Sequence, residues 1–408
     1  MKVNRTIPIL LCAVILVITV VLSSLSKPKE TAPASAASAA SAATAEITAA
    51  ATADEAKQEE PEMRGVWVTY MDLSMEYESN QSEAAFREKF AHIAKVCADS
   101  GFNTLIVQVR PFCDALYPSD FFPSSHILSG QQGDDPGYDA LQIICDTCRA
   151  FDLKLHAWIN PYRVRINETP RQLSDDNPFV TRPEMCIETE SGVILNPADA
   201  DARELIENGV REILENYDVD GIQFDDYFYP TDIGDADSEQ YEAQTSGKMS
   251  LEKWRMCNIN ILLAEVEMLV RKIKPDAVFG ISPQGNRQNN EKLCADVESW
   301  CCVRGYADYI CPQIYFSLDN PKLGFEDALA DWTALERTRN LKLYVGLAGY
   351  KAGTDADEGT WLNRDDILLE EYNILKKNHI DGFMLYSYPS LESDEARAEI
   401  KNLLSAIR

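Results

Sequence analysis

Two adjacent aspartates, Asp225 and Asp226, end an apolar segment that reads DGIQFDDYFYP. Two carboxyl groups at the end of an apolar strand are costly unless the chemistry of a site needs them. Because acids so close together cannot ionise independently, the pKa of one should rise, as a general acid or base requires. Alternation along a strand turns Ile222 and Phe224 toward covering helices. Gln223 and Asp225 then face the opposite side, and we predict Asp225 and Asp226 as catalytic residues at the rim.

No further carboxyl group is evident at another strand end, where it could face the Asp225–Asp226 pair across a bound substrate. Cleavage of a glycosidic bond usually uses two carboxyl groups that flank the bond. The later apolar segments end in SPQGN, PQIYFS, LAGYK and YSYPS, none of which contains an acid. Asp114, Asp139 and Asp319 are loop candidates, each of which could equally be a solvated turn residue. A substrate-assisted route, in which an N-acetyl group attacks, needs no second protein nucleophile.

Polar and aromatic side chains also follow or end the other apolar segments. Buried amides need hydrogen-bond partners that Val and Leu cannot supply, which favours sugar hydroxyls as the partners of the glutamines. Internal hydrogen bonds are the alternative, and His156 could be a hydrogen-bonded core residue or could orient an acid. Asp225 or Asp226 could also simply pair with an arginine. The predicted substrate-binding residues are Gln108, Arg110, His156, Trp158, Asn160, Tyr162, Arg163, Tyr227, Gln284, Asn286, Gln313, Tyr315 and Tyr388.

Eight short apolar runs alternate with amphipathic segments. The runs span residues 64–70, 102–110, 153–160, 221–229, 277–285, 309–317, 343–351 and 382–390. Helices are expected over 82–99, 138–151, 200–217, 251–273, 324–339, 364–378 and 393–407. Strands that are apolar on both faces indicate a parallel sheet covered by helices. Eight such repeats predict an α/β protein with a single (β/α)8 TIM barrel, in preference to an open doubly wound sheet with its Gly-rich turn.

The polar residues stand at the carboxyl ends of the predicted strands, where the loops of a barrel meet and substrates bind. Two long loops, about 161–198 and 230–249, are expected to form the walls of the site. They carry aromatic side chains that offer flat apolar faces for sugar rings.

The chain divides into three parts by composition. Residues 1–30 contain two basic residues followed by an apolar run, which predicts a signal peptide or an uncleaved signal anchor in a membrane. Residues 31–60 are rich in Ala, Ser and Thr and predict a disordered linker. Residues 61–408 hold the barrel. An extracytoplasmic, membrane-anchored or secreted protein of the bacterial cell envelope follows from this order.

Charge and motifs exclude several classes of function. The 408 residues carry a formal charge of −28, with 66 acidic and 38 basic residues, so nucleic acid is not an expected partner. The 11 cysteines are irregularly spaced and support no pairing, and the Cys145–Cys148 spacing lacks the ligands that would complete a zinc site. There is no nucleophile elbow, phosphate-binding loop or HExxH motif. We expect no metal and no cofactor.

The motifs MRGVWVTY, GFNTLIVQVRP, LHAWINPYRV, ILNPA, DGIQFDDYFYP, ISPQGN, DYICPQIYF, YVGLAGYK and DGFMLYSYP together resemble the bacterial glycosyl-hydrolase-like family ten over residues 64–390. The resemblance implies a TIM barrel that acts on envelope or extracellular glycans. Members of the family include a division-site glycosidase that cuts peptidoglycan strands stripped of their peptides. It also implies that the rim at Asp225 and Asp226 is the catalytic locus.

The same segment is similar in part to the DGxDxDxE signature of family-eighteen chitinases. Asp220, Gly221 and Asp225 fit that signature, whereas Gln223 replaces one aspartate and Tyr227 stands where the glutamate belongs. Asp226 is the nearest substitute for the missing acid.

The sequence therefore predicts a glycoside hydrolase that acts on a polysaccharide, with peptidoglycan glycan strands as the expected substrate. A glycan-binding barrel without turnover and a polysaccharide lyase or deacetylase are the alternatives.

Overall fold

The computed structural model describes residues 61–362 and 364–408, and the predicted anchor and linker lie outside this part of the chain. Eight parallel strands form a closed barrel in the order β1-β11-β10-β9-β8-β7-β3-β2. The barrel strands are β1 (Met63–Val68), β2 (Thr104–Arg110), β3 (Lys154–Ile159), β7 (Gly221–Phe224), β8 (Val278–Ile281), β9 (Tyr309–Ile310), β10 (Lys342–Leu347) and β11 (Gly382–Leu385). Each of them falls on one of the eight predicted apolar runs, so the TIM-barrel prediction is confirmed.

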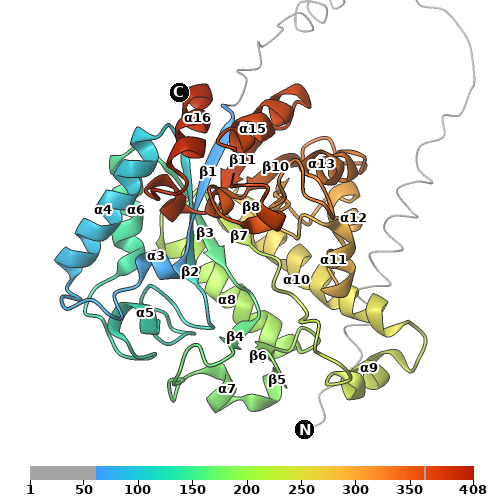
Figure 1. Ribbon diagram of the computed structural model, residues 1–408. Helices are drawn as coiled ribbons and strands as arrows, with labels where there is room; N and C mark the ends of the chain where they lie inside the picture. Colours follow the sequence, from blue (N-terminus) through green and yellow to red (C-terminus); the bar gives the residue numbers. More distant parts are fainter. Residues whose placement is uncertain (1–60, 363) are drawn as a thin grey trace, which may run out of the picture. The chain divides into compact units, whose positions relative to one another are not determined.

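The long helices cover the outside of the barrel strands (Figure 1). They are α4 (Glu83–Asp99), α6 (Ala140–Ala150), α8 (Ala200–Asn216), α10 (Leu251–Ile273), α13 (Phe325–Thr333), α15 (Ile367–Lys377) and α16 (Arg397–Ile407). Side-chain oxygens cap several of them, since Asp139 accepts from Gln142 N at 3.0 Å and Asp199 from Ala202 N at 2.9 Å. Such caps satisfy backbone N–H groups that a helix cannot satisfy itself.

Short elements occupy the loops. They are α3 (Tyr70–Leu73), α5 (His126–Ser129), α7 (Pro178–Thr181), η1 (Pro183–Met185), α9 (Ser238–Thr245), α11 (Arg287–Lys292), α12 (Val297–Cys302), η2 (Gly349–Lys351), α14 (Ala356–Gly359) and η3 (Tyr388–Leu391). Of the helices in residues 61–362 and 364–408, none is long and apolar enough to cross a membrane.

A small antiparallel sheet interrupts the connection between β3 and β7. It has the order β4-β6-β5 and consists of β4 (Arg163–Ile166), β5 (Cys186–Thr189) and β6 (Gly192–Leu195). Figure 1 shows this sheet together with α7, apart from the barrel strands. The sequence predicted only a long loop over this stretch, so the sheet is an addition to the expected architecture.

Two sets of buried side chains fill the fold. Between strands and helices lies a large apolar core that includes Ile222 and Phe224 of β7, both with no exposed area. Inside the barrel, Trp67, Trp158 and Tyr309 belong to a separate cluster. The predicted alternation along β7 is thus confirmed, since Gln223 between the two apolar residues bonds to the interior Trp67 and Tyr309.

Cys145 and Cys148 lie on α6 and are both 2% exposed. They belong to the apolar core between strands and helices, where a cysteine packs as a small apolar residue.

Candidate active site

Asp225 and Asp226 follow directly after β7, at the carboxyl end of the barrel. The parallel register pairs Phe224 with Ile159 of β3 and with Ile281 of β8. The next residues of the three strands therefore come together at one level. Asp225 is 3% exposed and Asp226 is 6% exposed, so both carboxyl groups are largely removed from water.

Asp225 is surrounded by hydrogen-bond donors. Trp158 Nε1 donates to its Oδ2 at 3.1 Å, and Asn160 Nδ2 donates to the same oxygen. The backbone N–H of Tyr227 donates to Oδ1 at 3.2 Å, and a guanidinium nitrogen of Arg163 lies 3.7 Å from Oδ2. Both carboxyl oxygens therefore act as acceptors, which stabilises the ionised form.

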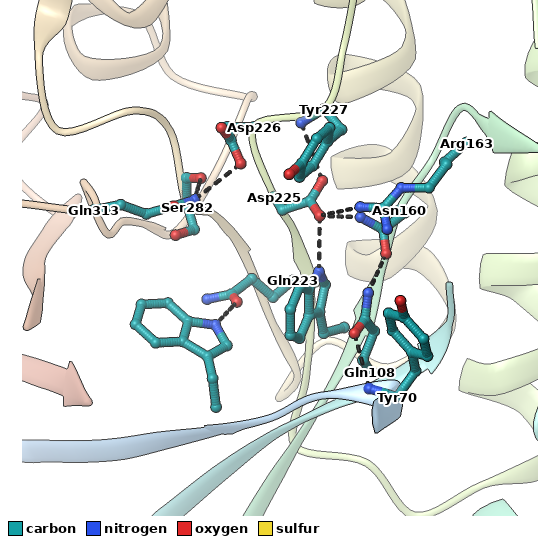
Figure 2. A network of polar contacts seen from close by, with 12 residues as sticks. Tyr70, Gln108, Asn160, Arg163, Gln223, Asp225, Asp226, Tyr227, Ser282 and Gln313 are labelled. Carbon is teal, nitrogen blue, oxygen red and sulfur yellow. Dashed lines mark hydrogen bonds and ion pairs between the residues drawn. The ribbon is translucent and has the colours of Figure 1, made fainter. Parts of the chain in front are cut away.

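A chain of amides fixes the direction of the Asn160 bond, as Figure 2 shows. The backbone N–H of Tyr70 can only donate, and it donates to Gln108 Oε1 at 3.0 Å. Gln108 must then present Nε2, which donates to Asn160 Oδ1 at 2.5 Å. Asn160 in turn must present Nδ2 to Asp225. Because the chain starts at an obligatory donor, the amide orientations are determined and Asp225 must accept.

Asp226 has different partners. Gln313 Nε2 donates to Asp226 Oδ1 at 3.0 Å and also to the backbone carbonyl of Ser282 at 2.9 Å, which fixes the direction of this amide. Gln284 Nε2 donates to Asp226 Oδ2. Within residues 61–362 and 364–408 its side chain makes no second hydrogen bond that would fix the amide, so a rotated Gln284 can accept a proton carried on Asp226 Oδ2.

Burial raises the pKa of both carboxyl groups. For Asp225 the loss of solvation is the largest effect, Arg163 opposes it, and the neighbouring charge of Asp226 adds to it. For Asp226 loss of solvation again raises the pKa, and the bonds from Gln284 and Gln313 oppose this. The pair therefore retains one proton to higher pH than an isolated aspartate would.

Beside the pair lies a cavity of about 560 Å³. One of its walls is the small sheet, through Arg163, Arg165 and Ile194, and the loop after β7 forms another, through Tyr227 and Asp232. Asp226 and Gln284 line this cavity and Asp225 does not. Of the pair, Asp226 is therefore the acid that a molecule bound in this cavity would meet.

Aromatic side chains gather on another part of the rim. Tyr386 lies 6.0 Å from Trp67, 5.5 Å from Tyr315 and 5.8 Å from Tyr350, measured between ring centroids. Tyr350 is 49% exposed. Tyr227, at 50% exposed, lies under the guanidinium of Arg163, with 4.3 Å from the guanidinium carbon to the ring centroid. These rings offer stacking surfaces around the acid pair.

Most of the predicted binding residues meet at this site. Those that touch the acid pair, its amide chain or the adjoining rings are Gln108, Trp158, Asn160, Arg163, Tyr227, Gln284, Gln313 and Tyr315. They come from β2, β3, β4, β7, β8 and β9 or from the residues that follow these strands.

Two predicted residues lie outside the barrel instead. A register shift between Gln108 and Arg110 breaks the alternation of β2. Arg110 consequently packs against Phe122, 3.8 Å from the ring centroid, and against Gly209 of α8. Tyr162 has no exposed area and lies in the core between strands and helices. We correct the prediction by removing both from the site.

His156 is in the barrel interior, below the rim. It pairs in register with Gly221 at the start of β7, and its Nδ1 lies 3.0 Å from the hydroxyl of Tyr309. Burial lowers its pKa to about 3, so the ring is neutral. His156 therefore corresponds to the core alternative, and it is not in a position to bind substrate.

Asn286 and Tyr388 are also turned away from the acid pair. Asn286 Oδ1 caps α11 by accepting from Gln288 N at 3.0 Å. The hydroxyl of Tyr388 donates to Glu392, which also binds His92 of α4. Two residues earlier, Tyr386 stands at the rim in place of Tyr388, because η3 begins at Tyr388 and ends the strand pattern.

Sequence reasoning missed three contributors, Trp67, Tyr386 and Arg165. Trp67 stands on the inward face of β1, and its position was visible in the alternation of GVWVTY. Arg165 belongs to the unpredicted sheet. Among residues 61–362 and 364–408, no three His, Cys, Asp or Glu side chains are grouped as metal ligands.

Comparisons with known proteins found relatives of this chain. The family described as Glycosyl hydrolase-like 10 matches residues 62–363. Glycosyl hydrolase YngK of Bacillus subtilis is 34% identical over 325 residues, covering 74% of this chain and 63% of the relative. Glycosyl hydrolase DigH of Escherichia coli K12 is 32% identical over 348 residues, covering 76% of this chain and 78% of the relative. The resemblance that the motifs indicated is confirmed.

Solved structures support the fold. The PgaB (BpsB) glycoside hydrolase domain of Bordetella bronchiseptica superimposes with a TM-score of 0.58 at 12% identity, over 84% of this chain and 99% of that one. A β-galactosidase of Marinomonas ef1 gives a TM-score of 0.56 at 12% identity, over 85% of this chain and 59% of that one. At these identities the likeness concerns the barrel alone.

Proposed function

Because this chain belongs to the Glycosyl hydrolase-like 10 family, we propose that it hydrolyses a β-linked amino-sugar glycan of the cell envelope, with Asp226 as the general acid. The enzyme class follows from the family. The substrate we propose is the glycan strand of peptidoglycan.

The asymmetry between the two acids supports this proposal. Both oxygens of Asp225 accept from donors whose direction is fixed, and Arg163 adds a positive charge nearby. Asp226 lines the cavity, and the unanchored amide of Gln284 can accept its proton. The shared proton therefore belongs on Asp226, where it can protonate the oxygen of a leaving sugar.

Asp225 is poorly placed to attack the sugar. Its oxygens are occupied by protein donors, and it does not line the cavity. Its charge instead keeps the neighbouring Asp226 protonated, because two adjacent carboxylates repel each other.

The attacking oxygen then comes from the substrate. Two other carboxyl groups line the same cavity, but Glu190 is exposed and Asp232 holds Ser191 through both of its oxygens. An N-acetyl carbonyl oxygen can attack the anomeric carbon while Asp226 protonates the leaving oxygen. Strands from which the acetyl groups have been removed should accordingly resist cleavage.

The first experiment measures reducing ends released from purified, peptide-free glycan strands. The parent should release them, and Asp226→Asn and Asp225→Asn should lose at least roughly a hundredfold in rate, since acid catalysis contributes about that much or more. Asp218→Asn is the matched control. Asp218 precedes the same strand at the opposite end of the barrel and pairs with Arg149, so its loss should leave the rate unchanged.

Other products would identify other functions. Unsaturated sugar ends would indicate a lyase, free acetate a deacetylase, and tight binding without any product a glycan-binding barrel. Equal rates for the parent and both aspartate variants would refute the assignment of the site.

The N-terminal segment completes the proposal. A signal peptide or anchor over residues 1–30 would deliver the barrel to the outer side of the cytoplasmic membrane, where peptidoglycan strands lie. Fractionation of cells that express the full chain tests this part separately from the chemistry.

A further inference from the structure

Arg165 lines the cavity beside the acid pair, and no residue of the described part of the chain gives it a charged partner. It lies on β4 and is half-buried, and Val164 between it and Arg163 turns into the core with no exposed area. Both arginines line the cavity. A cationic wall is unusual in a chain whose formal charge is −28.

The two arginines are bound very differently. Arg163 already has Asp225 at 3.7 Å and the ring of Tyr227 beneath it. The only hydrogen bond of the Arg165 side chain within the described residues is from Nη2 to the backbone oxygen of Arg171, at 3.4 Å. Its Nε is buried and, like that of Arg163, has no partner there. No described carboxylate lies within 4 Å of it.

The acids that line this cavity do not pair with Arg165. Asp232 accepts from the backbone and hydroxyl of Ser191, at 2.8 and 3.1 Å, and Glu190 is exposed. An unpaired, half-buried guanidinium loses solvation without regaining it from the protein. A bound anion would restore the loss, because the fork of N–H groups matches two oxygens in one plane.

We infer that Arg165 determines specificity by binding a carboxylate carried by a sugar of the substrate, on the β4 side of Asp226. The inference rests on the proposed function, since it takes the cavity as the glycan site. A carboxylate fits better than a phosphate ester. The acid pair, Asp225 and Asp226, would repel the two negative charges of a phosphate monoester more strongly than the single charge of a carboxylate.

The test compares three proteins on two substrates. The proteins are the parent, Arg165→Gln and a control, Arg304→Gln, in which an exposed arginine between α12 and β9 is replaced. The substrates are acidic glycan strands and the same strands with their carboxyl groups reduced to alcohols. Thermal unfolding checks that the variants fold.

The parent and Arg304→Gln should show a KM roughly tenfold to a hundredfold lower for the acidic strands, as expected for a hydrogen bond to a charged group. Arg165→Gln should lose this preference, so that its KM is the same for both kinds of strand. A preference that survives in Arg165→Gln, or that is absent from the parent, would overturn the inference.

Binding measurements distinguish failure of this inference from failure of the proposed function. Calorimetry with acidic and reduced oligosaccharides on Asp226→Asn, with and without Arg165→Gln, needs no turnover. Loss of the preference on removing Arg165 supports the inference even if no strand is cleaved. A third oligosaccharide with a phosphate ester in place of the carboxylate should bind more weakly, and tighter binding of it would overturn the choice of carboxylate.

Discussion

Replacing Asn160 by leucine tests whether the amide chain keeps Asp225 ionised. The substitution removes the Nδ2 donor to Asp225 Oδ2 and leaves Gln108 Nε2 buried without its acceptor. Leucine has a similar volume, so the packing around β3 changes little.

The size of the effect follows from the bond that is lost. A hydrogen bond to a charged group contributes about 1.5–3 kcal/mol, and one pKa unit corresponds to about 1.4 kcal/mol. A donor favours the ionised form, so its loss should raise the pKa of Asp225 by about one to two units. If activity needs ionised Asp225, the acid limb of the kcat/KM profile moves to higher pH by the same amount. The unpaired Gln108 should also lower stability by about 1–3 kcal/mol.

The assay is kcat/KM against pH for the parent, Asn160→Leu and Asn258→Leu. Asn258 is a matched control, because it is a buried amide on α10 whose Nδ2 donates to the Tyr229 hydroxyl at 3.3 Å and not to either aspartate. Asn258→Leu should lose stability and keep the parent's pH profile. An Asn160→Leu enzyme whose acid limb stays at the parent's pH would refute the reasoning.

Three further predictions concern the barrel and its rim. Gly280→Ala should destabilise the fold by about 1–3 kcal/mol or more in urea unfolding, because a Cβ there would lie 1.9 Å from Tyr309 Cζ. In the parent, burial holds the pKa of folded His156 at about 3, whereas the unfolded chain binds this proton near pH 6.5. The free energy of unfolding therefore decreases as the pH is lowered from about 6.5 to about 3. His156→Leu should reduce this fall, by up to about 1.4 kcal/mol per pH unit, and unfolding midpoints at several pH values measure it. Tyr386→Ala should raise KM roughly threefold to tenfold and Tyr388→Phe should leave it unchanged, and the opposite ranking in steady-state kinetics would contradict the rim described above.

The barrel was predictable because its signal is local and repeated. The barrel strands fall on short apolar runs, and seven of the eight runs are followed by a predicted amphipathic helix, so the sequence pattern alone places these elements to within a few residues. The acid pair was predictable for a related reason. Two aspartates after an apolar strand have no structural purpose that the strand itself explains.

The small sheet was not predicted because its strands have only four residues and do not alternate cleanly. Cys186 to Leu195 nevertheless contains a hairpin, in which Glu190 and Ser191 form the turn between β5 and β6. Without that sheet, Arg165 and the wall of the cavity could not be placed.

Arg110, Tyr162 and Tyr388 were misplaced for a common reason. Each follows or ends a strand, where a register shift, a bend into the next strand or a new helical turn changes which side a residue faces. The register shift beside Arg110 depends on pairing with β3, and no property of the β2 sequence alone reveals it.

Aryl glycosides of increasing leaving-group acidity test most directly whether Asp226 carries the proton that the acid pair donates. Asp226→Asn should be slowed by roughly a hundredfold or more when the leaving group needs a proton, and should approach the parent's rate when it needs none. Asp225→Asn, in which Asp226 is no longer kept protonated, should recover in the same way. An Asp226→Asn enzyme that is equally slow with every leaving group, or an Asp225→Asn enzyme that recovers while Asp226→Asn does not, would contradict the assignment.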